Sequence, residues 1–292
     1  MGDQMRRLSR PAAAIFAMIV TALALAAPAK AQDDSWHNYV QIWWDYGEVY
    51  ADLLAARDDG MMIFYEGKPN WESQPLTAGR GVGTEVDALL TPGDWNGDGA
   101  ADWMYRNSDG GLHVRGGWGD GYANRDYSGQ IGWGWDVMTA LTSPGDWDGD
   151  GSPDVLARDS TGALWMYRGD GTGGWIPGRI QVGWQWNVMT SIFSGHDFNA
   201  DGFGDVIARD NAGGLWLYPG NGSGGWKPRT QIGWGWDVMD LMAAPGDYDY
   251  DGNGDVIARD HQGTMWLYSG NGSGGFTFTS RTVNITTPKV FG

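Results

Sequence analysis

Asp94-Trp-Asn96-Gly-Asp98-Gly-Ala-Ala-Asp102 is the most informative stretch of this sequence of 292 residues. The same frame returns three more times, at intervals of 52, 51 and 50 residues, and these copies begin at Asp146, Asp197 and Asp247. Internal repetition at a period near 50 residues is typical of propellers and solenoids, in which each repeat is one structural unit. The stretch therefore predicts a repeat architecture.

Each unit has the same internal order, which is clearest in the third copy. An apolar run at 205–209 follows the acidic loop, and a turn with glycine leads to an alternating segment at 215–218. A glycine-rich turn then precedes Gln231-Ile-Gly-Trp-Gly-Trp236 and a last apolar segment at 238–242. Four short strands in one repeat correspond to one propeller blade.

A weaker copy precedes the first acidic loop. The segments 52–58 and 61–65 align with the second and third strands of the later units, but the residues before them have lost the acidic pattern. The sequence thus predicts an all-β chain, a β-propeller of about five four-stranded blades at residues 44–292. Its units are expected to start near residues 44, 94, 146, 197 and 247.

The acidic loops have the chemistry of a calcium site. Positions 1, 3, 5 and 9 are aspartate or asparagine, and glycine follows position 5 in every copy. A short segment of this kind can wrap hard oxygen ligands around a cation. An EF-hand would need glutamate at position 12, which is Tyr105, Ala157, Ala208 or Ala258. The alternative is a turn that binds nothing, but four copies with three or four acidic or amide groups each would then carry uncompensated repulsion.

On these motifs the chain resembles the FG-GAP or VCBS repeats of secreted bacterial proteins. The resemblance rests on Gly-Asp-Trp-Asn-Gly-Asp-Gly at 93–99, on its counterpart at 145–151, and on Leu-Tyr-x-Gly-Asn-Gly-Ser-Gly-Gly at 217–225 and 267–275. It implies kinship with the integrin alpha N-terminal propeller and with some fungal propeller lectins. It also implies that the acidic loop joins the two inner strands of a blade and holds calcium.

Carried over residue by residue, the resemblance implies about four calcium ions. Side chains at positions 1, 3, 5 and 9 and the backbone carbonyl at position 7 would be the ligands. The ligand sets are Asp94, Asn96, Asp98, Ala100 and Asp102; Asp146, Asp148, Asp150, Ser152 and Asp154; Asp197, Asn199, Asp201, Phe203 and Asp205; Asp247, Asp249, Asp251, Asn253 and Asp255.

The first 31 residues have the pattern of a secretory signal peptide. A basic start is followed by an apolar run from Ala12 to Ala27 and by the small-x-small site at 29–31. An uncleaved membrane anchor is the alternative, but the run falls short of the roughly 20 residues that a spanning helix needs. We therefore expect a secreted protein with no membrane span after cleavage and a short N-terminal segment at 32–43.

Charge and cysteine content narrow the class of partner. The formal net charge is −17, or −20 once residues 1–31 are removed, which opposes binding to nucleic acid and to anionic membranes. The chain has no cysteine, so an exported protein of this kind must be held together by its core or by metal. The 19 tryptophans and 49 glycines favour short strands and tight turns.

No catalytic constellation is visible in the sequence. The four histidines, His37, His113, His196 and His261, form no repeated or paired arrangement, and neither a nucleophile-elbow motif nor a phosphate loop occurs. The sequence therefore predicts that the protein is not an enzyme. A secreted hydrolase or lyase on a propeller scaffold stays open as an alternative, as does a purely structural module.

Binding of an extracellular glycan or protein is the favoured function. Paired tryptophans recur once per unit, and an aromatic ring can either stack on a sugar or pack between blades. The candidate ligand-binding residues are Trp133, Trp135, Trp184, Trp186, Trp234 and Trp236.

Overall fold

The chain is described by a computed structural model. It describes residues 23–25, 36–39, 43–45, 48–50, 53–57, 61–65, 75–80, 86–117 and 123–282. The predicted signal peptide lies outside these ranges except for residues 23–25, and its cleavage stays a prediction. Within the described ranges no helix is long and apolar enough to cross a membrane.

Four blades carry the 50-residue repeat, and each contains four antiparallel strands that follow one another in sequence; the sheet of the third blade has one further strand. This confirms the all-β propeller. The blades are β8 (Val86–Gly93), β9 (Asp102–Asn107), β10 (Leu112–Gly117) and β11 (Ala123–Gly132); β12 (Met138–Gly145), β13 (Asp154–Asp159), β14 (Leu164–Arg168) and β15 (Ile180–Gly183); β16 (Met189–His196), β17 (Asp205–Asp210), β18 (Leu215–Pro219) and β19 (Thr230–Gly233); β20 (Met239–Gly246), β21 (Asp255–Asp260), β22 (Met265–Gly270) and β23 (Phe276–Thr282).

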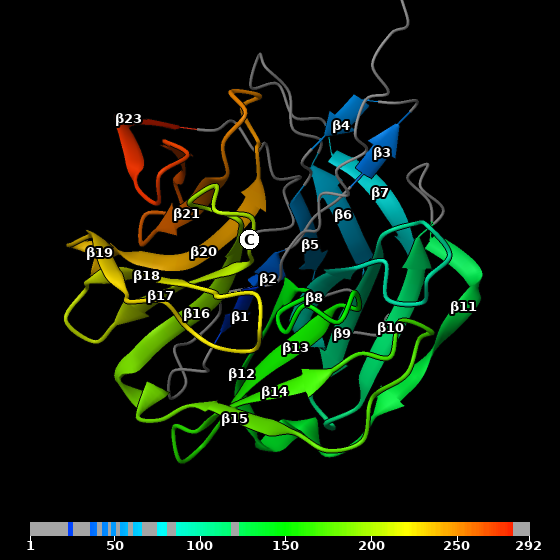
Figure 1. The fold of residues 1–292 in the computed structure, drawn as a ribbon. Coiled ribbons are helices and arrows are strands. Elements are labelled where there is room, and N and C mark those ends of the chain that lie inside the picture. The colour runs from blue at the N-terminus through cyan, green and yellow to red at the C-terminus, as the bar shows by residue number, and fades with distance from the viewer. Residues whose placement is uncertain are drawn as a thin grey trace, which may run out of the picture.

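The four blades surround β1 (Leu23–Leu25), a strand that belongs to the predicted signal peptide and would be absent after cleavage. The first strand of each blade is innermost, since β12 packs against β8 and β16, and β16 packs against β20 (Figure 1). Strand β1 lies against these four inner strands and pairs with β16. The inner strands therefore surround the axis of the propeller.

The number of regular blades is four, so the prediction of about five is corrected. The segment near residue 44 forms a separate hairpin, β3 (Trp43–Asp45) with β4 (Glu48–Tyr50). A further sheet places β2 (Trp36–Tyr39) beside β5 (Leu53–Arg57), β6 (Met61–Tyr65) and β7 (Pro75–Arg80), so its strands are not consecutive. This region has no acidic loop to connect two successive strands, and its first strand comes from the segment predicted to precede the propeller.

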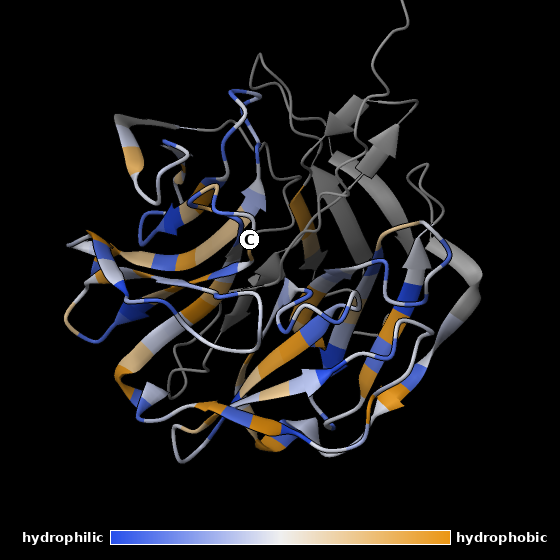
Figure 2. Ribbon diagram, viewed as in Figure 1, coloured by the Kyte–Doolittle hydropathy of each residue, from blue (hydrophilic) through white to orange (hydrophobic). Residues whose placement is uncertain are grey.

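Burial explains why the second and third strands of a blade differ in sequence. Strand β13 is buried at five of its six positions, as its near-continuous apolar sequence predicts, whereas β14 alternates between buried and partly exposed residues. Hydrophobic stretches recur along the strands of successive blades (Figure 2). The two clusters of buried residues each include side chains from more than one blade, so the core is shared between blades.

Consecutive connections in an antiparallel sheet alternate between its two ends. The acidic loop and the glycine-rich loop between the third and fourth strands therefore lie at one end of a blade. The hairpin turn between the second and third strands lies at the other end, together with the tryptophan turn that leads to the next blade. One contact confirms this pairing, because the amide of Trp186 donates to the carbonyl of Gly162 in the hairpin turn, at 2.9 Å.

Buried arginines connect each blade to the next. Arg158 ends the apolar run of β13, and its Nη1 donates to the carbonyls of Trp186 at 3.0 Å and Met189 at 2.5 Å, at the entry of the following blade. Arg106 and Arg209 make the same two kinds of contact in their own blades. A charged donor thus satisfies backbone carbonyls at each of these joints.

The residue before the acidic loop is His196 in the third blade and glycine in the other three. His196 has a left-handed backbone with φ of 56°, where Gly93, Gly145 and Gly246 have φ of 97°, 83° and 91°. A side chain in this conformation costs about 1–2 kcal/mol. In addition, the Nε2 of His196 is buried without a hydrogen-bond partner among the described residues.

We therefore expect His196→Gly to stabilise the fold by about 1 kcal/mol, because the strain relieved exceeds the entropy that glycine loses on folding. Urea unfolding of the variant and of the wild-type protein measures this difference in the free energy of unfolding. Gly246→His is the reverse control and should destabilise. A less stable His196→Gly protein would show that the imidazole contributes packing that outweighs its strain.

Candidate functional site: acidic loops and exposed tryptophans

The aspartate at position 9 fixes each acidic loop to its blade. In the second loop, Oδ2 of Asp154 accepts the amides of Trp147 at 3.0 Å and Asp148 at 3.3 Å, and Oδ1 accepts the amide of Gly169 at 3.3 Å. Asp102, Asp205 and Asp255 accept amides at corresponding positions. One buried carboxylate thus joins the loop to the third strand of the same blade.

The other acidic positions bend the loop around its own oxygens. Asp146 at position 1 accepts the amides of Gly149 and Gly151, at 2.8 and 2.9 Å. Asp148 at position 3 accepts the amide of Asp150, which accepts that of Ser152. Each of these carboxylates accepts hydrogen bonds from amides of its own loop, so the loop backbone curves around the carboxylate groups.

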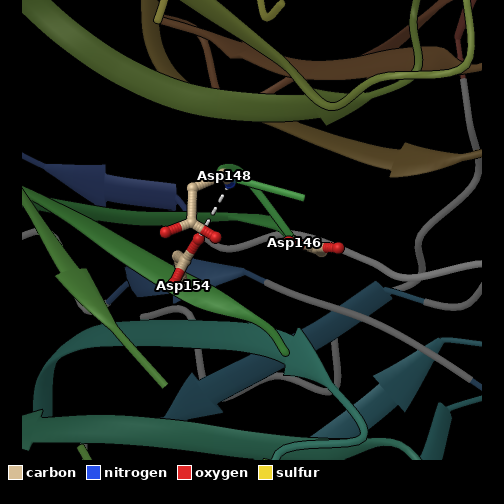
Figure 3. Close-up of side chains that lie close together, drawn as sticks. All are labelled: Asp146, Asp148 and Asp154. Carbon is tan, nitrogen blue, oxygen red and sulfur yellow. Dashed lines mark hydrogen bonds between the residues drawn. The ribbon is translucent and has the colours of Figure 1, made fainter. Parts of the chain in front are cut away.

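Carboxylates converge at two of the four loops. One oxygen each of Asp146, Asp148 and Asp154 lie within 4.8 Å of one another, and Figure 3 shows Asp148 close to Asp154, with Asp146 to one side. Asp247, Asp249 and Asp251 form a second such group. The loops at 94–102 and 197–205 have asparagine at position 3 and therefore one carboxylate fewer.

Burial places a large electrostatic cost on the position 9 carboxylates. Burial first, and the charge of nearby aspartates after it, raise the pKa of Asp102, Asp154 and Asp205 to about 7. The pKa of Asp255 rises to about 8, through burial first and the charge of Asp249 second. These groups need either a proton or a cation to offset their charge.

The donor set fits calcium. All side-chain groups at positions 1, 3, 5 and 9 are hard oxygens, three of them converge at each of two loops, and the amides bound to them leave lone pairs on each carboxylate. Calcium binding and the position 7 carbonyl ligands, those of Ala100, Ser152, Phe203 and Asn253, stay predictions.

The acidic loops also contact the next blade. The amide of Gly173 donates to the carbonyl of Trp95 at 3.1 Å, and that of Gly224 donates to the carbonyl of Trp147 at 3.0 Å. Trp95 at position 2 is fully buried, and its ring meets Trp175 edge-on with centroids 4.7 Å apart. A change in the conformation of an acidic loop would therefore alter the packing between its blade and the next one.

The predicted tryptophan pairs divide into two kinds. The first member is exposed, at 75% for Trp133, 72% for Trp184 and 83% for Trp234. The second member, Trp135, Trp186 or Trp236, is only 6–7% exposed and belongs to the core. Of the candidate ligand-binding residues, the second member of each pair therefore packs in the core, which is the alternative that the sequence left open.

The buried tryptophans fill the joints between blades. Trp186 packs on Tyr218 and Trp226 of the following blade, with centroid distances of 4.6 and 5.4 Å. Trp226 in turn donates its indole N–H to the carbonyl of Val182 at 2.6 Å. Trp135 and Trp236 occupy the equivalent places at the neighbouring joints. Aromatic packing of this kind adds to the area that it buries.

Each exposed tryptophan is part of a small mixed surface. Trp184 is followed by exposed Asn187 and by Val188, which is 43% exposed. The other blades repeat this arrangement, with Asp136 and Val137 near Trp133, and with Asp237 and Val238 near Trp234. An exposed tryptophan followed by an exposed polar residue and an exposed valine therefore recurs in three turns, at the end of the blades opposite the acidic loops.

A second tryptophan that recurs once per repeat lies on the third strand of the blade. The indole N–H of Trp165 donates to Oδ2 of Asp159 at 2.8 Å, and the guanidinium of Arg179 lies 3.8 Å from the ring centroid. Trp216 has the same arrangement with Asp210 and Arg229. The repeated spacing of six residues between aspartate and tryptophan could have revealed the hydrogen bond. No pattern in the sequence indicates the stacked arginine.

These features define a repeat β-propeller with acidic loops at one end of its blades and exposed tryptophans at the other. Residues 197–258 match the family model of the FG-GAP-like repeat, so this part of the chain carries an FG-GAP-like repeat, as the resemblance predicted. No curated protein matches the sequence.

Solved structures of lectins have a similar fold. The BP39L lectin of Burkholderia pseudomallei superposes with a TM-score of 0.52 at 16% identity, over 88% of this chain and 74% of the lectin. An Agrocybe aegerita lectin that recognises non-reducing terminal N-acetylglucosamine gives 0.48 at 17% identity, over 82% of this chain. The chain spans 63% of the length of that second lectin. At 16% identity, the similarity to the Burkholderia pseudomallei lectin shows the fold alone.

Proposed function

We propose that the chain is a secreted, calcium-stabilised propeller that binds carbohydrate and has no catalytic role. The observation that carries this proposal is the repetition of an exposed tryptophan, Trp133, Trp184 or Trp234, at three equivalent joints. Leaving a large apolar ring 72–83% exposed to water costs solvation free energy. A single exposed tryptophan on a protein surface is nevertheless common and needs no explanation. Three cases at one position of the repeat indicate a binding surface.

Carbohydrate suits this surface better than an extended protein interface does. A sugar ring offers an apolar face to an indole and hydroxyls to polar groups, and exposed Asp136, Asn187 and Asp237 follow the exposed tryptophans three residues later in the same turns. Each turn exposes one tryptophan and one valine, which is less than the roughly 800 Å² per partner that a stable protein interface buries. The shared fold of the Burkholderia pseudomallei lectin makes glycans the first class to test, by analogy alone.

Three equivalent patches favour a ligand with repeated or clustered sugars. A single tryptophan patch supplies little binding free energy, but linked sites raise the total affinity by increasing the effective concentration of the next sugar. The chain would thus bind polysaccharides or dense surface glycans more tightly than free monosaccharides.

Calcium supports the same function indirectly. The loops at 146–154 and 247–255 would hold it through the converging carboxylates of Asp146, Asp148 and Asp154 and of Asp247, Asp249 and Asp251. A bound divalent cation neutralises these carboxylates and ties the first two strands of a blade together. Because the tryptophans lie at the other end of the blades, the ion would stabilise the scaffold without contacting the sugar.

The test is binding of the chain to a glycan array and to insoluble polysaccharides. We expect alanine at Trp133, Trp184 or Trp234 alone to weaken binding several-fold, and the triple variant to lose on the order of 100-fold or more, as loss of multivalency requires. The melting temperature should stay unchanged, because the rings are exposed.

Phe203→Ala is the matched control, since Phe203 is an aromatic side chain, 40% exposed, at the acidic end of its blade. It should leave glycan binding intact. Equal loss in the control and in the triple variant, or no glycan binding by the unchanged chain, would favour a structural module. Turnover of a bound polysaccharide would favour the hydrolase or lyase alternative.

A further inference from the structure

The acidic loop at 197–205 differs from the others because a lysine reaches it. The ammonium of Lys227 donates to Oδ2 of Asp201, at position 5 of the loop, over 2.7 Å. The same ammonium lies 4.5 Å from the centroid of the Phe203 ring, at position 7. The backbone amide of Lys227 donates to the carbonyl of Pro219 at 2.8 Å, which holds the residue beside the loop.

No charged residue occupies the position of Lys227 in the neighbouring blades, although Arg168 at the end of β14 interacts electrostatically with Asp148 of its own acidic loop. Lys227 directly follows Trp226, which pairs with Gly220 across the glycine-rich loop of its blade. The equivalent residues after Trp175 and Phe276 are Ile176 and Thr277. Among the three glycine-rich loops that the structure describes between third and fourth strands, only this one therefore brings a positive charge to an acidic loop.

The loop at 197–205 is also less acidic than its neighbours on either side. It has Asn199 at position 3, where the loops at 146–154 and 247–255 have Asp148 and Asp249. Those two loops gather three carboxylates within 4.8 Å. A loop with one carboxylate fewer and a resident ammonium attracts a divalent cation less, because like charges close together repel.

We propose that Lys227 is the built-in cation of the loop at 197–205, and that this loop is a weaker calcium site than those at 146–154 and 247–255. The inference rests on the proposed calcium binding. A monovalent ammonium neutralises part of the loop's charge without any ion from solution, and a divalent ion at the same loop must bind beside it. The four similar motifs would then be sites of unequal affinity.

Reciprocal variants test the proposal by calcium titration calorimetry, with native mass spectrometry to count the ions. Lys227→Ile copies the residue of the preceding blade and should tighten one calcium site on the order of 10-fold, the size expected for removing one unit charge near a divalent ion. Adding Asp201→Asn to that variant should abolish the gain and so locate it. Ile176→Lys should weaken one tight site by a similar factor.

The outcomes separate this proposal from the proposed function. Tight calcium sites that neither lysine variant changes would overturn the role of Lys227 and leave calcium stabilisation standing. Calcium binding to none of the proteins would overturn both. The pair lies near the surface, with side-chain exposures of 38% and 27%, so the variants should fold normally in chelator, and their melting temperatures there serve as the control.

Discussion

Exhaustive chelation of calcium should lower the melting temperature by several degrees or more, on the order of 10 °C if two sites are tight. A ligand present at 100 times its dissociation constant stabilises the folded state by about 2.7 kcal/mol per site. For a chain of this size, 1 kcal/mol corresponds to about 2–4 °C. The loops at 146–154 and 247–255 have the converging carboxylates for such sites.

The effect of chelation should be larger at pH 8 than near pH 5. The pKa of Asp102, Asp154 and Asp205 is raised to about 7 in the metal-free fold, and that of Asp255 to about 8. A raised carboxyl pKa means that the folded state holds protons that the unfolded state releases, so stability falls as the pH rises from about 4 toward 7 or 8. Calcium offsets this loss only where the carboxylates are ionised.

Calorimetric melts with calcium and with chelator, at both pH values, measure these effects. Asp148→Asn removes one converging carboxylate and should reduce the shift caused by calcium. Asp136→Asn is the matched control, because Asp136 is exposed in a tryptophan turn at the other end of the blades. Identical melts with and without calcium at pH 8 would refute calcium as a stabilising ligand.

The repeat was predictable because both the spacing of the motifs and the residue types within them recur. The acidic frame and the strands after it recur within two residues of a constant period, so the four regular blades follow from the sequence. The N-terminal sheet could not be predicted in the same way. Its first strand, β2, joins β5 across the β3–β4 hairpin, and no repeated motif marks that pairing.

The division of the tryptophan pairs shows where strand periodicity misleads. Two residues at i and i+2 point to the same side only if the strand continues through both. Here β19 ends at Gly233, Gly235 has a left-handed backbone with φ of 74°, and a 3-10 turn begins at Trp236. The chain therefore rotates between Trp234 and Trp236, so that one ring points to solvent and the other into the joint.

The buried arginines mark a different limit of sequence reasoning. The motif Asp-Val-Leu-Ala-Arg at 154–158, with isoleucine at its third position at 205–209 and 255–259, is visible as a repeated strand, but its last residue has the character of a polar strand end. Arg158 instead donates to carbonyls 28 and 31 residues away, in the connection to the next blade. Every residue has a backbone carbonyl, so the sequence cannot indicate which carbonyls accept from an arginine. These hydrogen bonds are found only from the structure.

Trp186→Ala should destabilise the chain by about 3–5 kcal/mol, the usual cost of removing a large aromatic side chain from a core. Trp186 is 7% exposed and packs on Tyr218 and Trp226, so alanine leaves a cavity at the joint between the second and third regular blades. The carbonyl of Trp186 also accepts from Arg158, and the cavity would loosen that contact. Urea unfolding monitored by tryptophan fluorescence and by circular dichroism measures the loss.

Trp184→Ala is the matched control, two residues away in the same turn but 72% exposed, and it should change stability by less than about 0.5 kcal/mol. The two variants separate scaffold from binding surface within one motif: Trp186→Ala should lose stability, and Trp184→Ala should lose glycan binding at unchanged stability. If Trp186→Ala were as stable as the unchanged chain, the joints between blades would not depend on their aromatic packing. If Trp184→Ala unfolded instead, the exposed ring would be a structural element and the proposed sugar platform would be lost with it.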